Sequence, residues 1–393
     1  MTDIVHGAAP LRDREPILPR WWRTLDKWLL CFVLVLAAIG ILLAFAASVS
    51  LAQDNRPADP FYYVRQQVLF ATAAIGLMGG VSMLGPTLVR RLALIGFAMS
   101  LLALMALPIW GTDFNKGAIR WYALGFGSVQ PSEFVKPMLV VVMAWLIAGC
   151  QHMPSHCRHI LSLILLLVVV GFLVHQPDYG QAMLIFAGWV VMFFFAGGSL
   201  VLLAGAGGLA LVGGLLAYEV SDHFKARIDG YLSGEVEANS QLWHALSAIR
   251  EGGLLGVGPG NGQAQYRLPD AHTDFIIAVA VEEYGLFLAL VIMVLYAGVV
   301  WRVFLRLLHE CDRFTRLAGV GLVSLFCGQA LINLGVAVRL LPAKGMTLPF
   351  ISYGGSSLVA SGITLGILLA LTRSRPQNRL GAILQSRHER RRG

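Results

Sequence analysis

Long apolar runs constrain the fold of this chain more than any other feature of its sequence. A helix that crosses a bilayer needs about 20 mostly apolar residues, because each residue adds about 1.5 Å of rise. The expected fold class is therefore an all-α integral membrane protein with ten transmembrane helices and a large extracytoplasmic loop between spans seven and eight. The predicted spans cover residues 28–51, 66–85, 91–110, 133–150, 158–175, 178–196, 199–219, 274–300, 315–338 and 347–372.

The composition supports a membrane protein and argues against other classes. Of the 393 residues, 57% are hydrophobic and only 13% are charged, whereas soluble domains are about 25% charged. The net charge of +8 is typical of basic cytoplasmic loops, so we expect no nucleic-acid binding. The five cysteines are odd in number, and none lies in the long loop, so no disulfide framework is expected.

The distribution of Lys and Arg predicts the orientation and the domains. Basic residues concentrate on the side that holds the N-terminus, which places both termini in the cytoplasm. The first span follows a basic stretch and is too long for a signal peptide, so we expect it to remain uncleaved. The predicted parts are a cytoplasmic segment 1–27, a ten-span domain 28–372 with the extracytoplasmic loop 220–273, and a basic cytoplasmic tail 373–393.

The stretch "GAIRWYALGFGSVQPSEFVKPML", from Gly117 to Leu139, places ionisable residues near the outer membrane surface. Glu133 and Lys136 are three residues apart, so they share a helix face and can form an ion pair. One interpretation is a helix start with a neutralising pair. The other is a functional site, because ionisable residues in membranes are functional candidates. The spacing leaves both open, and Arg120 joins the candidates.

Two further polar stretches interrupt apolar sequence on the same predicted side. "HQPDYGQ" contains Gln176 and Asp178 at the junction of spans five and six, either as a tight turn or as part of a site. "LPAKGMTLPFISYGGSS" contains Lys344 and Ser352 at the entrance to the last span. Non-helical backbone at membrane depth is tolerated where it lines a wet cavity. The second stretch therefore predicts either a polar cavity or an ordinary loop.

Two patterns that suggest ligand binding do not match known motifs. "REGGLLGVGPGNGQ" lacks the ending of a phosphate-binding loop and the spacing of a dinucleotide fingerprint, so we expect a flexible or re-entrant loop. A short predicted cytoplasmic loop contains metal-ligand residue types, but their spacing matches no standard zinc pattern, and no metal site is predicted. These residues are Cys150, His152, His156, Cys157 and His159.

The stretch "LPDAHTDFIIAVAVEEYG" contains the strongest catalytic candidate. Thr273 and Asp274 suit the N-cap of span eight, which would be a purely structural role. At 1.5 Å of rise per residue, Glu282 and Glu283 are expected to lie about 12–14 Å deeper in the membrane than Asp274. We therefore interpret Asp274 as the reactive candidate and Glu283, like Glu133, as a structural polar residue.

Seven stretches together resemble the SEDS family (shape, elongation, division and sporulation), and they follow one another in the family's order over about residues 30–372. They are "GAIRW", "QPSEFVK", "HQPDYGQ", "GVGPGNG", "LPDAHTDFI", "EEYG" and "LPAKGMTLPFISYGGSS". The N-terminal segment and "PDAHTDFI" are more similar to the division members than to the elongation members. The chain departs from the family at Gln181, where threonine is usual, and at Ile119, where arginine is frequent.

The resemblance implies a peptidoglycan glycosyltransferase that polymerises lipid II into glycan strands at the outer face of the cytoplasmic membrane. The family's essential aspartate corresponds to Asp274, the implied catalytic base, and undecaprenyl pyrophosphate is the implied leaving group. A lipid II flippase or a non-catalytic division scaffold are the alternatives. The candidate substrate-binding residues are Arg120, Lys136, Lys344, His272, Thr273, Gln176, Asp178 and Ser352.

The resemblance also implies partners and a location. Beyond lipid II and the growing glycan strand, these are a class B penicillin-binding transpeptidase and other division proteins. The expected location is the bacterial inner membrane, at the division septum. No cofactor is expected, although the sequence leaves open whether a divalent cation assists the pyrophosphate.

Overall fold

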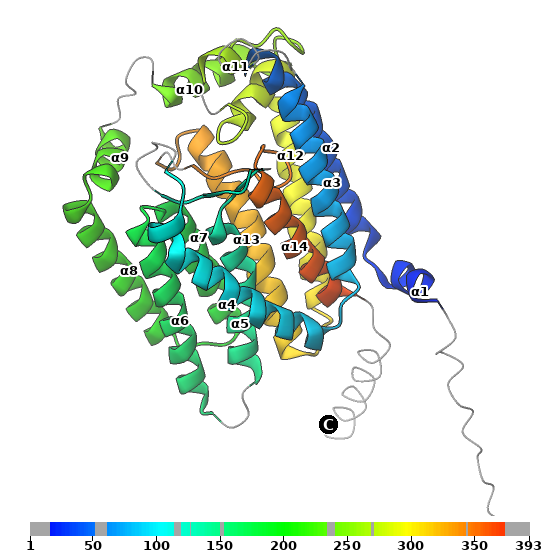
Figure 1. Ribbon diagram of the computed structural model, residues 1–393, viewed down its shortest axis with the longest axis vertical. Helices are drawn as coiled ribbons and strands as arrows, with labels where there is room; N and C mark the ends of the chain where they lie inside the picture. The colour runs from blue at the N-terminus through cyan, green and yellow to red at the C-terminus, as the bar shows by residue number, and fades with distance from the viewer. Residues whose placement is uncertain are drawn as a thin grey trace, which may run out of the picture.

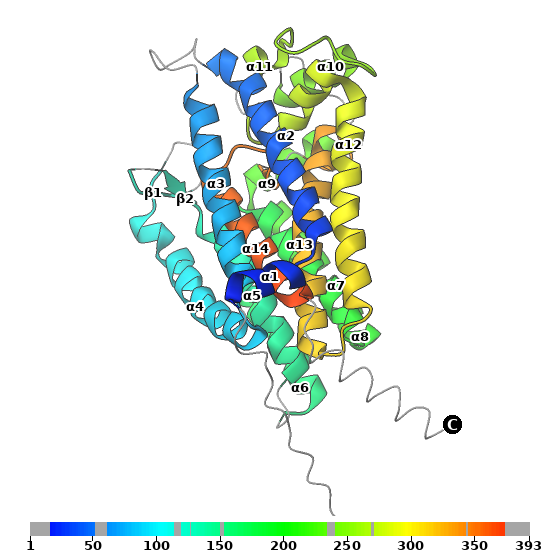
Figure 2. The ribbon, with the colours of Figure 1, turned by 90° about the vertical axis from the view of Figure 1, so that its right-hand side faces the viewer.

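The computed structural model describes residues 16–51, 61–113, 119–125, 127–149, 153–233, 240–268, 271–342 and 345–373. Its long helices run roughly side by side in one elongated bundle (Figures 1 and 2). A helix overlaps each of the predicted spans. These helices are α2 (Lys27–Leu51), α3 (Tyr62–Ser82), α4 (Pro86–Trp110), α5 (Pro131–Gly149), α6 (Ser155–His175), α7 (Tyr179–Phe195), α8 (Leu200–Val220), α12 (Ile276–Leu307), α13 (Arg313–Ala337) and α14 (Gly355–Thr372).

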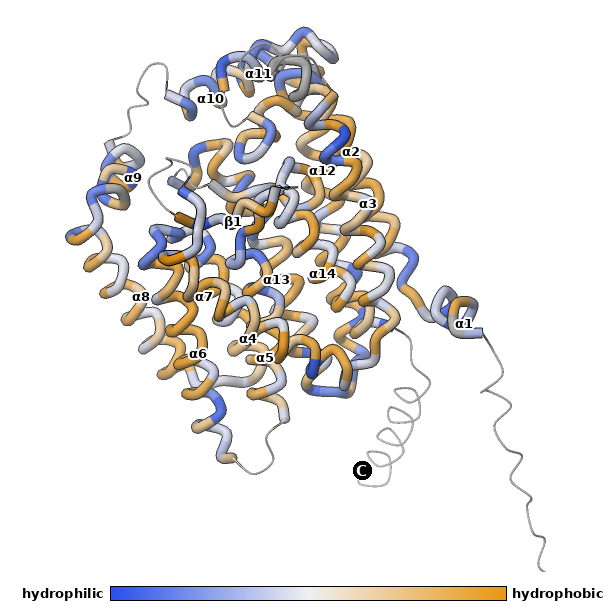
Figure 3. Tube along the Cα trace, viewed as in Figure 1, coloured by the Kyte–Doolittle hydropathy of each residue, from blue (hydrophilic) through white to orange (hydrophobic). Residues whose placement is uncertain are grey.

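The all-α membrane class is confirmed. Among the described residues, eight helices are long and apolar enough to cross a membrane, namely α2, α4, α5, α6, α8, α12, α13 and α14. Helix α7 is apolar but has only 17 residues, and α3 contains Arg65, Gln66 and Gln67 in its first turns. The total of ten spans therefore stays a prediction. Apolar residues dominate the body of the bundle, and polar residues gather at the end that carries α9, α10 and α11 (Figure 3).

The centre of the bundle is formed by α5, α13 and α14, which have the most buried surfaces of the membrane-spanning helices. Helix α14 packs along α3, and α13 packs against α5 and α7. Small residues permit this close approach, as is usual between membrane helices. A Cβ atom on Gly362 of α14 would lie 2.5 Å from the Ala74 carbonyl oxygen of α3. Helix α8, in contrast, lies at the edge of the bundle with its apolar side chains exposed.

Within the predicted loop 220–273, the described residues form three helices, α9 (Asp222–Leu232), α10 (Gln241–Gly252) and α11 (Ala264–Arg267). Serine side chains cap the first two, because Ser221 accepts a hydrogen bond from the Phe224 amide and Ser240 accepts one from the Trp243 amide. Helix α10 packs against α12 at one end of the bundle (Figure 1). The remaining described elements are α1 (Ile17–Thr24) and the antiparallel strands β1 (Tyr122–Ala123) and β2 (Ser128–Val129).

The helix after Asp274 is not straight. Within α12, Gly285 has φ 76° and ψ 176°, so two helical pieces meet at this residue. A Cβ atom on Gly285 would lie 2.2 Å from the Leu254 carbonyl oxygen, so both the dihedral angles and the packing require glycine. Glu282 and Glu283 lie in the short helical piece before this break and not in the long piece that continues to Leu307.

The two glutamates instead lie against the glycine-rich segment between α10 and α11. The Val257 amide donates to the Glu282 carbonyl at 2.8 Å, and the Gly258 amide donates to the Glu283 carbonyl at 3.1 Å. The Glu282 carboxylate accepts a hydrogen bond of 2.7 Å from the Gln263 amide. The glycine-rich stretch is thus a packed loop that holds the first piece of α12, and a structural role for Glu283 stays a prediction.

Candidate functional site

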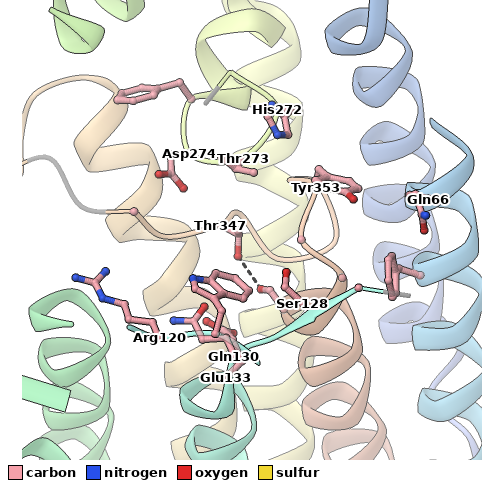
Figure 4. Close-up of a pocket in the computed structure, with 18 of the residues that line it drawn as sticks. Gln66, Arg120, Ser128, Gln130, Glu133, His272, Thr273, Asp274, Thr347 and Tyr353 are labelled. Atoms are coloured by element: carbon pink, nitrogen blue, oxygen red, sulfur yellow. Dashed lines mark hydrogen bonds between the residues drawn. The ribbon is translucent and has the colours of Figure 1, made fainter. Parts of the chain in front are cut away.

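A cavity of about 470 Å³ opens at the end of the bundle near α9 (Figure 4). Its volume falls in the range of about 300–1,000 Å³ that is typical of small-molecule sites. The lining comes from segments far apart in the sequence. They are the start of α3, the β1–β2 hairpin, the starts of α5, α7 and α10, α9, the residues before α12, and the loop before α14 with the first turn of that helix.

Asp274 lines this cavity just before α12 begins. Its backbone is fixed from α13, where the Asn333 amide nitrogen donates to the Asp274 carbonyl at 3.0 Å and to the Met346 carbonyl at 2.6 Å. Asn333 thereby fastens the base candidate to the loop before α14. A Cβ atom on Gly345 would lie 3.1 Å from Asp274 Oδ2, so glycine leaves room for the carboxylate. Figure 4 shows that the carboxylate lies between Arg120 on one side and His272 and Tyr353 on the other.

Two arginines, Arg120 and Arg227, form a cationic wall of the cavity. Arg120 lies just before β1, and its guanidinium donates to the Gln176 carbonyl at 3.0 Å and to the Pro177 carbonyl at 2.7 Å. The "HQPDYGQ" turn therefore orients this arginine by its backbone. Arg227 belongs to α9. Its pKa is lowered by burial and by the charge of Arg120, while Asp178 and Asp274 act in the opposite direction. The wall suits an anionic group such as a phosphate.

A buried polar network forms the floor of the cavity. Lys136 Nζ lies 2.9 Å from Glu133 Oε2 and 2.8 Å from Gln329 Oε1, and Gln181 donates to Glu133 Oε1 at 2.6 Å. The predicted ion pair is confirmed, with both side chains 5% exposed. Gln329 in turn donates to the Thr347 carbonyl at 2.9 Å. The network thus ties α5, α7 and α13 to the loop before α14.

Four of the substrate-binding candidates lie behind the lining rather than in it. Lys136 belongs to the buried floor. Gln176 donates to the Leu104 carbonyl at 3.0 Å, Asp178 accepts from Gln130 at 3.2 Å, and Ser352 accepts from the Leu348 amide at 2.8 Å. Each of these contacts stabilises the protein's own structure. A direct substrate role for the four stays a prediction, while Arg120, His272 and Thr273 do line the cavity.

Aromatic side chains form the wall opposite the arginines. This aromatic wall comprises Tyr62 and Phe70 of α3, His272, and Tyr353 of the loop before α14. The Tyr353 amide donates to the His272 carbonyl at 2.9 Å. Tyr63 packs behind the wall, with its ring centroid 5.0 Å from that of His272 and 5.3 Å from that of Tyr353. Burial raises the pKa of Tyr353 to about 12, so its hydroxyl stays protonated.

The remaining candidates concern a cation and residues outside the described ranges. Lys344 lies outside the described residues, as do Cys150 and His152 of the histidine-rich loop. Across the described ranges, the structure contains no group of three or more His, Cys, Asp and Glu side chains that could hold a metal ion. A divalent cation carried by the substrate diphosphate therefore stays an open expectation.

Sequence reasoning missed Arg227, Asn333 and three members of the aromatic wall, which are Tyr62, Phe70 and Tyr353. Arg227 lies in a polar stretch beside Lys225, whose ammonium group instead lies over the Tyr218 ring. Their positions in the sequence do not show which of the two residues lines a site. Asn333 is an uncharged residue in the last turns of α13, and an amide within an apolar span was the signal that could have indicated it.

Comparisons with known proteins agree with this architecture. Residues 27–377 match the model of the FtsW, RodA and SpoVE family, described as "Cell cycle protein". A protein of Caulobacter vibrioides named "Probable peptidoglycan glycosyltransferase FtsW" is 42% identical over 375 residues, 95% of each chain. A protein of Halorhodospira halophila with the same name is 34% identical, over 94% of this chain and 95% of the relative.

Solved structures share the fold. A chain from a peptidoglycan synthase complex, solved to show the structural coordination of polymerization and crosslinking, superposes with a TM-score of 0.73 at 27% identity, covering 89% of this chain and 98% of that chain. The rod shape determining protein RodA of Thermus thermophilus gives a TM-score of 0.67 at 26% identity, covering 89% and 97%.

Proposed function

The chain belongs to the FtsW, RodA and SpoVE family of cell cycle proteins, and on that premise we propose that it is a peptidoglycan glycosyltransferase that polymerises lipid II. The names of its relatives support the activity, and the cavity supports the chemistry. The observation that carries the proposal is the carboxylate of Asp274, in a cavity that also presents the two guanidinium groups of Arg120 and Arg227.

In the proposed reaction, Asp274 acts as the general base. It takes the proton from the 4-hydroxyl of lipid II, and the hydroxyl oxygen forms a bond with the anomeric carbon of the growing strand. The bond between that carbon and the diphosphate oxygen breaks, and its electron pair leaves with undecaprenyl diphosphate. Negative charge therefore develops on the leaving group, where preorganised cations lower the barrier.

The arginines are the proposed stabilisers of the leaving group. Arg120 is preorganised, because two backbone carbonyls hold its guanidinium. Arg227 is partly withdrawn from water, which strengthens its interaction with an anion. Lys136 is a weaker candidate than sequence alone suggests, because Glu133 and Gln329 occupy its ammonium group below the lining. A base within one cavity with two such cations favours group transfer over simple passage of a lipid.

The proposal extends to partners and location. One structural relative was solved within a peptidoglycan synthase complex that coordinates polymerization with crosslinking, which supports a crosslinking partner for this chain. A class B penicillin-binding transpeptidase is the proposed partner, acting with other division proteins. The apolar helices support a multi-pass membrane protein. The proposed setting is the inner membrane at the septum, with the cavity on the outer side and both termini in the cytoplasm.

Lipid II polymerisation by purified protein, with and without the partner, tests the proposal. Asp274→Asn keeps the shape of the side chain but removes its basicity, so glycan strands should disappear while folding and partner binding persist. A fluorescent lipid II translocation assay in proteoliposomes separates the flippase alternative. Translocation without polymerisation by the wild type would overturn the enzyme assignment in favour of that alternative.

A further inference from the structure

The two walls of the cavity differ in chemistry. The cationic wall is formed by Arg120 and Arg227, whereas the aromatic wall is formed by Tyr62, Phe70, His272 and Tyr353, with the Gln66 amide beside it. Two further aromatic residues, Trp121 and Phe275, line the cavity next to Arg120 and Asp274 in the chain and belong to neither group. Asp274 lies between the walls, as Figure 4 shows for Arg120 and Tyr353. In Figure 1, α9 and α3, which contribute to opposite walls, lie on opposite sides of the cavity end of the bundle.

The proposed reaction requires the attacking group and the leaving group to lie on opposite sides of the reacting carbon. In a displacement at an anomeric carbon, the attacking hydroxyl approaches from the side opposite to the leaving group. If the leaving diphosphate binds at the cationic wall, the attacking sugar must come from the other side of Asp274. The aromatic wall occupies that side.

Aromatic side chains with nearby amides are suited to sugars. The C–H groups on one face of a pyranose ring carry partial positive charge and pack against the negative face of an aromatic ring. The Tyr353 hydroxyl is protonated at neutral pH and can donate a hydrogen bond to a sugar. Tyr63 packs behind His272 and Tyr353 and limits their freedom to rotate, which lowers the entropic cost of binding.

We propose that the aromatic wall is the acceptor subsite, which binds the N-acetylhexosamine rings of the incoming lipid II and presents its 4-hydroxyl to Asp274. The inference rests on the proposed function and adds to it the wall at which each substrate binds. The growing strand is held by its diphosphate at the arginines, and the acceptor saccharide is held at the tyrosines. The two substrates are therefore recognised by different chemistry at different walls.

Two soluble probes separate the walls in the full-length protein in detergent. The first is tetra-N-acetylchitotetraose, which has sugar rings but no diphosphate, and the second is inorganic diphosphate. Tyr62→Leu and Tyr353→Leu should weaken tetrasaccharide binding about tenfold and leave diphosphate binding within about twofold of wild type. Arg227→Gln should give the reverse pattern. Tyr266→Leu, which removes an exposed tyrosine outside the lining, is the matched control.

The ratio of the effects on KM and kcat gives a second measurement, which a loss of folded protein alone would not change. Tyr62→Leu should raise the KM for lipid II more than it lowers kcat, and Tyr62→Phe should restore most of the loss because it keeps the ring. Tetrasaccharide binding that is unaffected by both tyrosine variants would overturn the inference, as would undetectable binding by wild type. Neither result would touch the glycosyltransferase proposal, which fails if the wild type does not polymerise lipid II. Polymerisation by Asp274→Asn would refute only the assignment of Asp274 as the base.

Discussion

Replacing one member of the buried Glu133–Lys136 pair should destabilise the protein far more than replacing both. Lys136→Met leaves the Glu133 carboxylate only 5% exposed and without its cation. Removing one partner of a buried ion pair costs about 3–5 kcal/mol, because the remaining charge is neither hydrated nor compensated. We expect the loss of stability in Lys136→Met to lie at the upper end of this range, because Lys136 also donates to Gln329 and so links α5 to α13.

The double variant Glu133→Gln/Lys136→Met removes both charges while keeping similar shapes. The amide oxygen at position 133 can still accept the hydrogen bond from Gln181 that is 2.6 Å long in the wild type. We expect the double variant to recover most of the stability, to within about 1–2 kcal/mol of wild type, as replaced buried pairs often do.

Unfolding by sodium dodecyl sulfate in mixed micelles, followed by circular dichroism, would measure the four proteins of this cycle. A Lys136→Met variant that is as stable as wild type but fails to polymerise lipid II would refute the structural interpretation. That result would return Lys136 to the substrate-binding candidates. Equal destabilisation in the single and double variants would refute the reasoning about the uncompensated charge.

Two further predictions concern the opposite ends of the bundle. Burial raises the pKa of Asp26, but hydrogen bonds from two arginines of α12 outweigh it and leave the pKa below its ordinary value. The ionised Asp26 side chain therefore stabilises the protein fully at neutral pH, and this stabilisation is lost as pH falls below about 4. In thermal unfolding from pH 7 to pH 3, Asp26→Asn should lose less stability than the wild type. Equal losses of stability in the two proteins would contradict this prediction. Gly345→Ala should lower the initial rate of strand synthesis about tenfold, because its Cβ atom would lie 3.1 Å from Asp274 Oδ2. The control Gly230→Ala, where a Cβ atom meets nothing within 4 Å, should keep the wild-type rate. Equal rates in the two variants would argue against crowding of the base.

The helices of the bundle were largely predictable, because hydropathy reports burial in lipid directly. A helix overlaps each predicted span, and the loop 345–354 that interrupts the entrance to α14 was indicated by Pro349 and the glycines. The break at Gly285 was not predictable in this way. The apolar run continues through it, and the need for glycine arises from the approach of Leu254, which is distant in the sequence.

The site was predictable where its chemistry requires a charge near the membrane surface. Asp274, Arg120 and the Glu133–Lys136 pair were all identified as candidates from an apolar background. Arg227 was not, because α9 lies in a polar segment where arginine carries little information. The separation of residues that line the cavity from those that support it also required coordinates. Gln176 orients Arg120 through its backbone carbonyl, which any residue type could supply.

The central claim is that the Asp274 carboxylate is the base for glycan polymerisation. The most direct measurement is the rate of strand synthesis from lipid II by wild type and by Asp274→Asn, in the same detergent and with the same partner. We predict strands from the wild type and a loss of at least about a hundredfold in the variant, with unchanged thermal unfolding. A folded Asp274→Asn protein that polymerises lipid II near the wild-type rate would contradict the account.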